Sequence, residues 1–343
     1  MKLSTTMLFV LALFASGYCQ AESEIVIKFS HVVAPDTPKG KAAEKFKQLA
    51  EQRTNGRVKV EIYPDSLLYN EREEIEALQS GAVQMLAPAF SQFKAIDLNS
   101  FDLFDLPYAF PSMEILHRFV DGKSGQSLFN KLPAKGLMGL AYWDNGYKQM
   151  SSNKIMHTVR NLKKLRIRIQ PSKVLEAQIK ALGASPQELP ASGVYASLQQ
   201  GILDGTENTV ADFYAGNLHE VQQHLTISNH GYLGYAVIVN KSFWDDLPID
   251  IRSTLIQAMN ETTIYERDVA KQANDAALAK VIASNSTNVY TLSPRQRTAW
   301  QRALLPVYQQ FDQLIGNYLI RSIGRTAKIV KREQDMARKK QKN

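Results

Sequence analysis

The segment between Pro248 and Pro294 contains neither glycine nor proline, and it constrains the fold more than any other part of the sequence. Residues from about 250 to 283 have helical spacing and are rich in strong helix formers. At 1.5 Å per residue, a helix of this length would span roughly 50 Å, which exceeds the width of one small α/β lobe. We therefore expect a single helix that crosses two lobes. Two helices joined at an unmarked turn are the alternative interpretation.

The N-terminal part of the chain alternates predicted strands with predicted helices. The strands are expected at 24–29, 58–63 and 82–86, and the helices from Thr37-Pro38 to about Gly56 and over 71–79. This order predicts an α/β domain with helices on both faces of a largely parallel sheet. Ligands of such sheets bind beyond the carboxyl ends of the strands. His31, Ser91 and Gln92 fall in the corresponding loops.

A similar alternation follows in the second third of the chain. It comprises a strand at 166–169, a helix capped by Ser172 and ended by Gly183, a short helix at 194–199 and a buried strand at 235–239. The sequence therefore predicts two α/β lobes of similar build.

The composition, 44% hydrophobic and 22% charged, fits a soluble globular protein with a sizeable core. The formal net charge is +8, but nine basic and only two acidic residues lie between Arg321 and Asn343, so segment 22–320 has no net charge. A nucleic-acid-binding protein would instead need a basic face on its folded part. We expect a solvated, frayed tail; contact with a membrane surface or a partner is the alternative.

The N-terminus has the layout of a secretory signal peptide. Lys2 precedes an apolar run over 7–15, and small residues flank a cleavage site after Ala21. Cleavage there would give a periplasmic protein that begins at Glu22 and lacks the sole cysteine, Cys19. The alternative, a lipid anchor on Cys19, is disfavoured by the bulky Tyr18 before it.

No catalytic or metal-binding motif is present: no HExxH, GxGxxG or GxSxG occurs. An anion-binding pattern remains. Arg166 and Arg168 alternate with isoleucines on a predicted strand, just before the helix that begins after Ser172. A guanidinium beside a helix N-terminus suits a carboxylate, because its fork donates two parallel hydrogen bonds. Ordinary surface ion pairs are the alternative reading of these arginines.

Five stretches of the sequence together resemble one known family. They are FSHVVAPDTPKG (29–40), WDNGYKQ (143–149), LRIRI (165–169), DGTEN (204–208) and SNHGYLGY (228–235). In this order and spacing the chain resembles the DctP-type solute-binding proteins of tripartite ATP-independent periplasmic (TRAP) transporters. The resemblance implies an α/β, two-lobe periplasmic binding protein fold with a long helix crossing both lobes. It also implies organic-acid binding, no enzymatic activity and no cofactor.

The resemblance assigns the site residues. It places the carboxylate-gripping arginine on Arg168, a second basic contact on Lys148 and an amide contact on Asn208. His31, Ser91 and Tyr235 are further ligand-binding candidates, each with packing or loop-shaping as its alternative role. Lysine at 148 resembles the C4-dicarboxylate branch, so malate, succinate or fumarate is the expected ligand class.

Two departures from the family pattern concern the pocket. Ala191 and Val210 stand where many relatives have bulkier side chains. A roomier cavity would accept a longer, branched or aromatic acid.

The resemblance further implies a membrane permease as partner, no nucleic acid and a monomer. We expect a signal peptide at 1–21, lobe I at 22–145 plus about 234–265, lobe II at 146–233 plus about 266–325, and a basic tail at 326–343. Two alternative functions stay open: a periplasmic sensor subunit that presents the ligand to a signalling receptor, and a secreted enzyme that uses cleft carboxylates.

Overall fold

The computed structural model describes residues 24–340, so the candidate signal peptide lies outside the described residues. In this part of the chain nine strands form one sheet. They are β1 (Ile25–Ser30), β2 (Val58–Tyr63), β3 (Met85–Leu86), β4 (Leu137–Ser152), β5 (Arg166–Ile169), β6 (Ser185–Glu188), β7 (Gly205–Asn208), β8 (His224–Asn240) and β9 (Asn288–Thr291).

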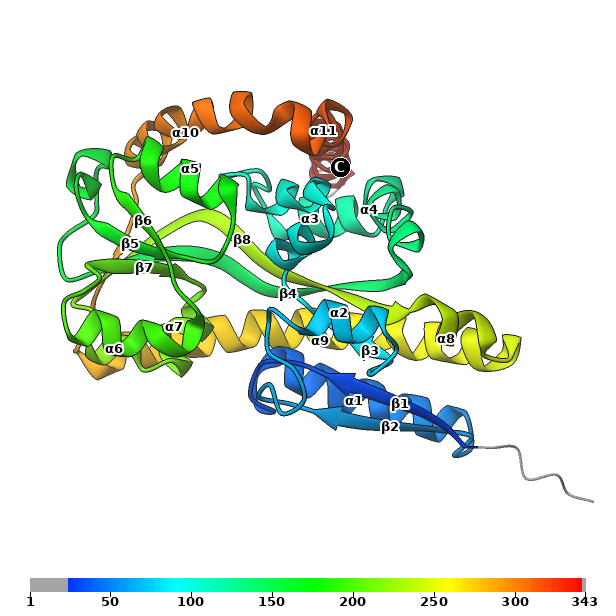
Figure 1. The fold of residues 1–343 in the computed structure, drawn as a ribbon. Coiled ribbons are helices and arrows are strands. Elements are labelled where there is room, and N and C mark those ends of the chain that lie inside the picture. The colour runs from blue at the N-terminus through cyan, green and yellow to red at the C-terminus, as the bar shows by residue number, and fades with distance from the viewer. Residues whose placement is uncertain (1–23, 341–343) are drawn as a thin grey trace, which may run out of the picture.

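Helices cover this sheet on both sides, joined by short 3-10 turns (Figure 1). The α-helices are α1 (Pro38–Arg53), α2 (Glu74–Gln79), α3 (Met113–Val120), α4 (Lys123–Phe129), α5 (Lys173–Ala181), α6 (Val194–Gln199), α7 (Val210–Ala215), α8 (Lys241–Asp246), α9 (Ile249–Ser284), α10 (Pro294–Ile315) and α11 (Asn317–Lys340). The predicted strands at 58–63 and 166–169 and the helix at 194–199 match β2, β5 and α6.

The sheet order is β2-β1-β3-β8-β4-β7-β5-β6, with β9 beside β8. Parallel pairs lie at both ends, β1 with β2 and β3, and β5 with β6 and β7. The central strands β4 and β8 run antiparallel and are 16 and 17 residues long, so they pass through both bodies of the molecule. We call the body around β1–β3 lobe I and the body around β5–β7 lobe II.

Helix α9 confirms the single long helix: it runs without a break for 36 residues, from Ile249 to Ser284. It packs on α1 of lobe I and on α7 of lobe II (Figure 1). Leu255 and Met259 join the core of lobe I, whereas Ala277 and Val281 join that of lobe II. One helix therefore contributes to two hydrophobic cores and ties the lobes together. The expected residue boundaries of the lobes stay a prediction.

The expectation of a frayed tail after residue 325 is wrong for residues 326–340, which belong to α11. Leu319, Ile323 and Val330 of this helix are buried, because their spacing of four and seven places them on one face. An ion pair between Arg118 of α3 and Glu333, 2.5 Å long, adds to the contact. No helix among residues 24–340 is long and apolar enough to cross a membrane.

Candidate functional site

A cavity of about 330 Å³ lies between the two lobes. Lobe I contributes the turn between β1 and α1, the start of α1 and part of α2, and lobe II contributes the ends of β5 and β7 with α6 and α7. Its polar and charged lining residues are Thr37, Lys39, Glu71, Glu74, Gln92, Arg168, Gln170, Tyr195, Asn208, Asp212 and Tyr235. The carboxyl ends of parallel strands thus meet at this cavity, as the sequence pattern predicts.

Arg168 lies near the carboxyl end of β5 and lines the cavity. Its side chain is buried, and its one hydrogen bond to the described residues runs from Nε to the carbonyl oxygen of Leu189, at 2.8 Å. Burial lowers the pKa of Arg168, with partial compensation from Glu207, Glu71 and Asp212, yet a guanidinium keeps its charge at neutral pH. The terminal nitrogens are therefore free to bind a carboxylate.

Arg166, two residues earlier, has a different role. Its guanidinium Nε lies 3.0 Å from Asp204 Oδ2, and this pair is solvent-exposed. The alternative interpretation of a surface ion pair is thus correct for Arg166, whereas Arg168 forms part of the cavity lining.

Asn208 and Tyr235 also line the cavity. Asn208 is the last residue of β7. The hydroxyl of Tyr235 lies 2.6 Å from Asn145 Nδ2, and burial raises the pKa of Tyr235 well above its ordinary value, so the phenol is neutral. Three of the predicted residues, Arg168, Asn208 and Tyr235, are therefore gathered around one cavity.

Lys39 is a cavity residue that the sequence analysis missed. It lies in the first turn of α1, donates a hydrogen bond of 3.0 Å to the carbonyl oxygen of Ala87, and sits 3.9 Å from the centre of the Tyr235 ring. Burial lowers the pKa of Lys39, while Glu74, Glu71 and Asp212 oppose that shift. A cation in the first turn of a helix opposes the helix dipole. That conflict was the signal available in the sequence.

Two buried acids accompany the two cations. Burial raises the pKa of Glu74 to about 8, against the influence of Lys39, so this carboxyl is mostly neutral at pH 7. Burial also raises the pKa of Asp212, which accepts hydrogen bonds of 3.1 and 3.2 Å from Asn145. Burial disfavours a negative charge on both acids, whereas Arg168 keeps its positive charge, so the cavity suits an anion.

The other three predicted residues do not line the cavity. Lys148 is buried, and its ammonium lies 2.8 Å from Glu207, which also lies 3.0 Å from His230. His31 and Ser91 are buried beside cavity-lining neighbours, and their side chains have no hydrogen-bond partner among the described residues. Burial and the charge of Lys39 lower the pKa of His31 to about 4, so its ring is neutral.

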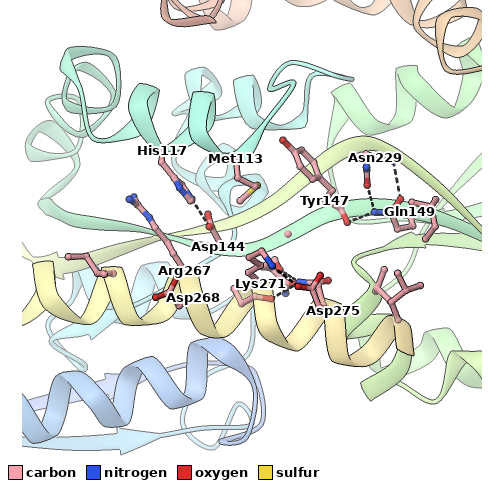
Figure 2. A pocket seen from close by; sticks show the side chains of 18 residues that line it. Met113, His117, Asp144, Tyr147, Gln149, Asn229, Arg267, Asp268, Lys271 and Asp275 are labelled. Carbon is pink, nitrogen blue, oxygen red and sulfur yellow. Dashed lines mark hydrogen bonds and ion pairs between the residues drawn. The ribbon is translucent and has the colours of Figure 1, made fainter. Parts of the chain in front are cut away.

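A second cavity, of about 550 Å³, is larger but has no lining residue in common with the first. It lies between α3 and α9 along β4, where His117 meets Asp144 at 2.7 Å (Figure 2). Its cations are already paired: Arg267 with Asp121 and Lys271 with Asp275. Size alone would favour this cavity, but the smaller one offers a buried guanidinium with free donors.

The two departures from the family pattern fall in different places. Ala191 lines the interlobe cavity, as expected. Val210 instead lines the larger cavity and packs in the core of lobe II, so the expectation that it enlarges the ligand pocket is wrong. Val210 opens α7, and this helix presents Asp212 and Ala215 to the ligand cavity.

Comparison with known proteins agrees with this geometry. Residues 29–314 match the family described as DctP, bacterial extracellular solute-binding protein, family 7. The chain belongs to this family. DctP-family members are binding subunits of transporters and not enzymes, so the alternative of a secreted cleft enzyme is set aside.

Curated relatives cover most of the chain. A C4-dicarboxylate-binding periplasmic protein DctP of Rhodobacter capsulatus is 51% identical over 87% of this chain and 90% of its own length. A C4-dicarboxylate-binding protein DctB of Bacillus subtilis is 40% identical over 88% of this chain and 86% of its own length.

Solved structures show the same two-lobe fold. A TRAP periplasmic solute-binding protein from Shewanella oneidensis with bound succinate superimposes with a TM-score of 0.84 and 37% identity, covering 88% of this chain and 99% of that one. Another, from Pseudomonas aeruginosa with bound L-malate, has a TM-score of 0.80 and 39% identity, covering 83% of this chain and 99% of that one.

Proposed function

We propose that this DctP-family protein captures a C4 dicarboxylate in the interlobe cavity and delivers it, as a monomer, to the membrane permease of a TRAP transporter. The observation that carries the proposal is the placement of Arg168 in the wall of lobe II and Lys39 in the wall of lobe I. The names of the relatives and the ligands of the solved structures support the same ligand class.

In this proposal one carboxylate binds the fork of Arg168, with Asn208 donating from its amide. The second carboxylate approaches Lys39, so the ligand bridges the lobes. A ligand favours the closed form only to the extent that it makes better contacts there, and a diacid held at both ends does so. Tyr235 stacks on Lys39 and orients it. Lys148, His31 and Ser91 stay candidates for indirect roles beneath the site.

Ala191 leaves a second ligand class open, because a small side chain in the cavity wall makes room for a longer or branched acid. The cavity volume of about 330 Å³ lies at the lower end of the range that small-ligand sites occupy, roughly 300–1,000 Å³, which favours a short diacid.

Thermal unfolding tests the ligand class. At about 100 times its dissociation constant, a bound diacid stabilises the folded protein by about 2.7 kcal/mol, which for a chain of this size is a rise in Tm of about 4 °C. We expect this shift with succinate, malate or fumarate. Butyrate, which has one carboxylate on four carbons, is the matched control and should shift Tm far less. If only aromatic or branched monocarboxylates shift Tm, the C4-dicarboxylate assignment is wrong.

Export is tested separately, by the intact mass of protein recovered from the periplasm. Cleavage after Ala21 predicts a mass that begins at Glu22 and contains no cysteine. A mass that retains Cys19, with or without a lipid, would contradict a soluble periplasmic protein.

A further inference from the structure

No described residue of α11 lines the interlobe cavity, and the helix lies beyond residue 314, where the family match ends. The helix follows Gly316, whose φ of +105° breaks the chain direction after α10. Its inner face packs on α3 and α10, so its orientation relative to the body of the protein is fixed (Figure 1).

Five basic residues gather on the outward face of this helix. At 100° per residue they fall within a sector of about 60°, opposite the buried face, and extend over about 27 Å. These residues are Arg321, Arg325, Lys328, Arg332 and Lys339. All five are exposed, and none forms an ion pair with another described residue. Their charges are therefore available to an external partner.

Apolar side chains border the basic sector on one side. Tyr318, Ile329 and Met336 are 60%, 49% and 57% exposed, and their spacing of eleven and seven keeps them on one edge of the helix. Arg325 lies over the Tyr318 ring at 4.9 Å, so the two stripes adjoin. A helix with lysines and arginines beside exposed apolar side chains is typical of segments that lie in the headgroup region of a membrane.

We propose that α11 holds the protein against an anionic lipid surface, with the basic sector on the headgroups and the apolar edge in the outermost acyl region. The convex face of a helix suits a flat, fluid surface, whereas an acidic protein partner would need a matching groove and would gain little from the apolar edge. This surface contact would keep the ligand-bearing protein beside a membrane-embedded permease. This proposal does not depend on which acid binds in the cavity.

Sedimentation with lipid vesicles tests this. The intact mature protein is mixed with vesicles of phosphatidylcholine alone or with about 30% phosphatidylglycerol, at about 50 mM and about 500 mM salt. We expect binding only to the anionic vesicles, and weaker binding at high salt. One lysine or arginine at such a surface contributes roughly fivefold to partitioning, from about 1 kcal/mol at 1.4 kcal/mol per tenfold. The double variant Arg325→Glu with Arg332→Glu should therefore bind anionic vesicles at least about 25-fold more weakly than the parent protein.

A matched control comes from α10. Arg295 and Arg302 are also exposed, have the same spacing of seven and give the same change in net charge when both become glutamate. This control should bind vesicles within about threefold of the parent protein. Ile329→Ser with Met336→Ser, which leaves every charge in place, should weaken binding at both salt concentrations without changing the salt dependence.

Three results would overturn the proposal. The first is an equal loss of vesicle binding in the α10 and α11 arginine variants. The second is unchanged vesicle binding when Ile329 and Met336 become serine. The third is that the protein does not bind anionic vesicles but is captured, through the same arginines, by a permease held in a neutral bilayer. The last result would assign the basic face to an acidic protein surface. Circular dichroism on each variant establishes that the fold is intact.

Discussion

Replacing Arg168 by alanine is expected to weaken binding of the acid by about a hundredfold to several thousandfold. In the proposed complex the ligand carboxylate is shielded from water between the lobes, so removal of its cationic partner would leave a buried charge unpaired, which costs roughly 3–5 kcal/mol. Arg168→Lys should also be costly, because an ammonium cannot reproduce the two parallel hydrogen bonds of the guanidinium. Isothermal titration calorimetry with the ligand identified by thermal shift measures both.

Arg166→Ala is the matched control, since it removes the same side chain from the same strand. Its pair with Asp204 is exposed, so the change should leave affinity nearly unaltered. Lys148→Ala should weaken binding less than Arg168→Ala does, because the ammonium lies against Glu207 and outside the cavity lining. If Arg168→Ala binds within about threefold of the parent, the anchor and the location of the cleft are both wrong.

Glu207→Gln is expected to lower the free energy of unfolding by about 3–5 kcal/mol, the cost of leaving a buried ion without its partner. Glu207 and Lys148 are each about 2% exposed, and His230 lies on the other carboxylate oxygen. Urea unfolding of the two proteins measures the difference. Lys148→Met combined with Glu207→Gln should recover much of the loss, because an apolar side chain replaces the orphaned ammonium.

The ion pair between Glu207 and Lys148 makes the stability of the fold depend on pH. Although burial opposes ionisation, Lys148 and His230 hold the pKa of Glu207 at about 2. A carboxyl whose pKa is lower in the folded state contributes stability above its unfolded pKa, and this contribution disappears as the pH falls from about 4.5 towards 2. The difference in free energy of unfolding between the parent protein and Glu207→Gln should therefore shrink as the pH falls through this range. An advantage of under about 1 kcal/mol at pH 7 would show that the pair contributes little.

Local patterns in the sequence predict five of the eleven α-helices in residues 24–340, namely α1, α2, α5, α6 and α9. The glycine-free stretch gives α9 because continuous helix formers leave no place for a break, and Thr37-Pro38 marks the start of α1, where the Thr37 side chain accepts a hydrogen bond from Gly40. Strand β4 was not predicted, because Asp144, Asn145 and Gly146 interrupt any alternation of apolar and polar residues. The structure accommodates them as register shifts opposite β8.

The site was predicted only in part, and the reason is physical. Alternation on a strand that ends before a helix indicates Arg166 and Arg168 together, and only the family resemblance distinguishes Arg168 as the anchor. Lys39 and Glu74 could not be paired from the sequence, because desolvation of a charged group depends on the packing of segments far apart in the chain. Lys148 was expected at the ligand because the family resemblance places a second basic contact at this position. The alternation of β7 instead turns Glu207 towards it and Asn208 towards the cavity.

The continuity of β4, β8 and α9 through both lobes determines how the molecule can move. At these crossings the lobes are joined by continuous secondary structure. Closure of the cleft must therefore bend two hydrogen-bonded strands and one long helix together. The pairing of the two strands shifts between Asp144 and Gly146, and Gly146 has a φ of +143° that few other residues adopt. A relative movement of the lobes that closes the cleft would therefore deform all three shared elements.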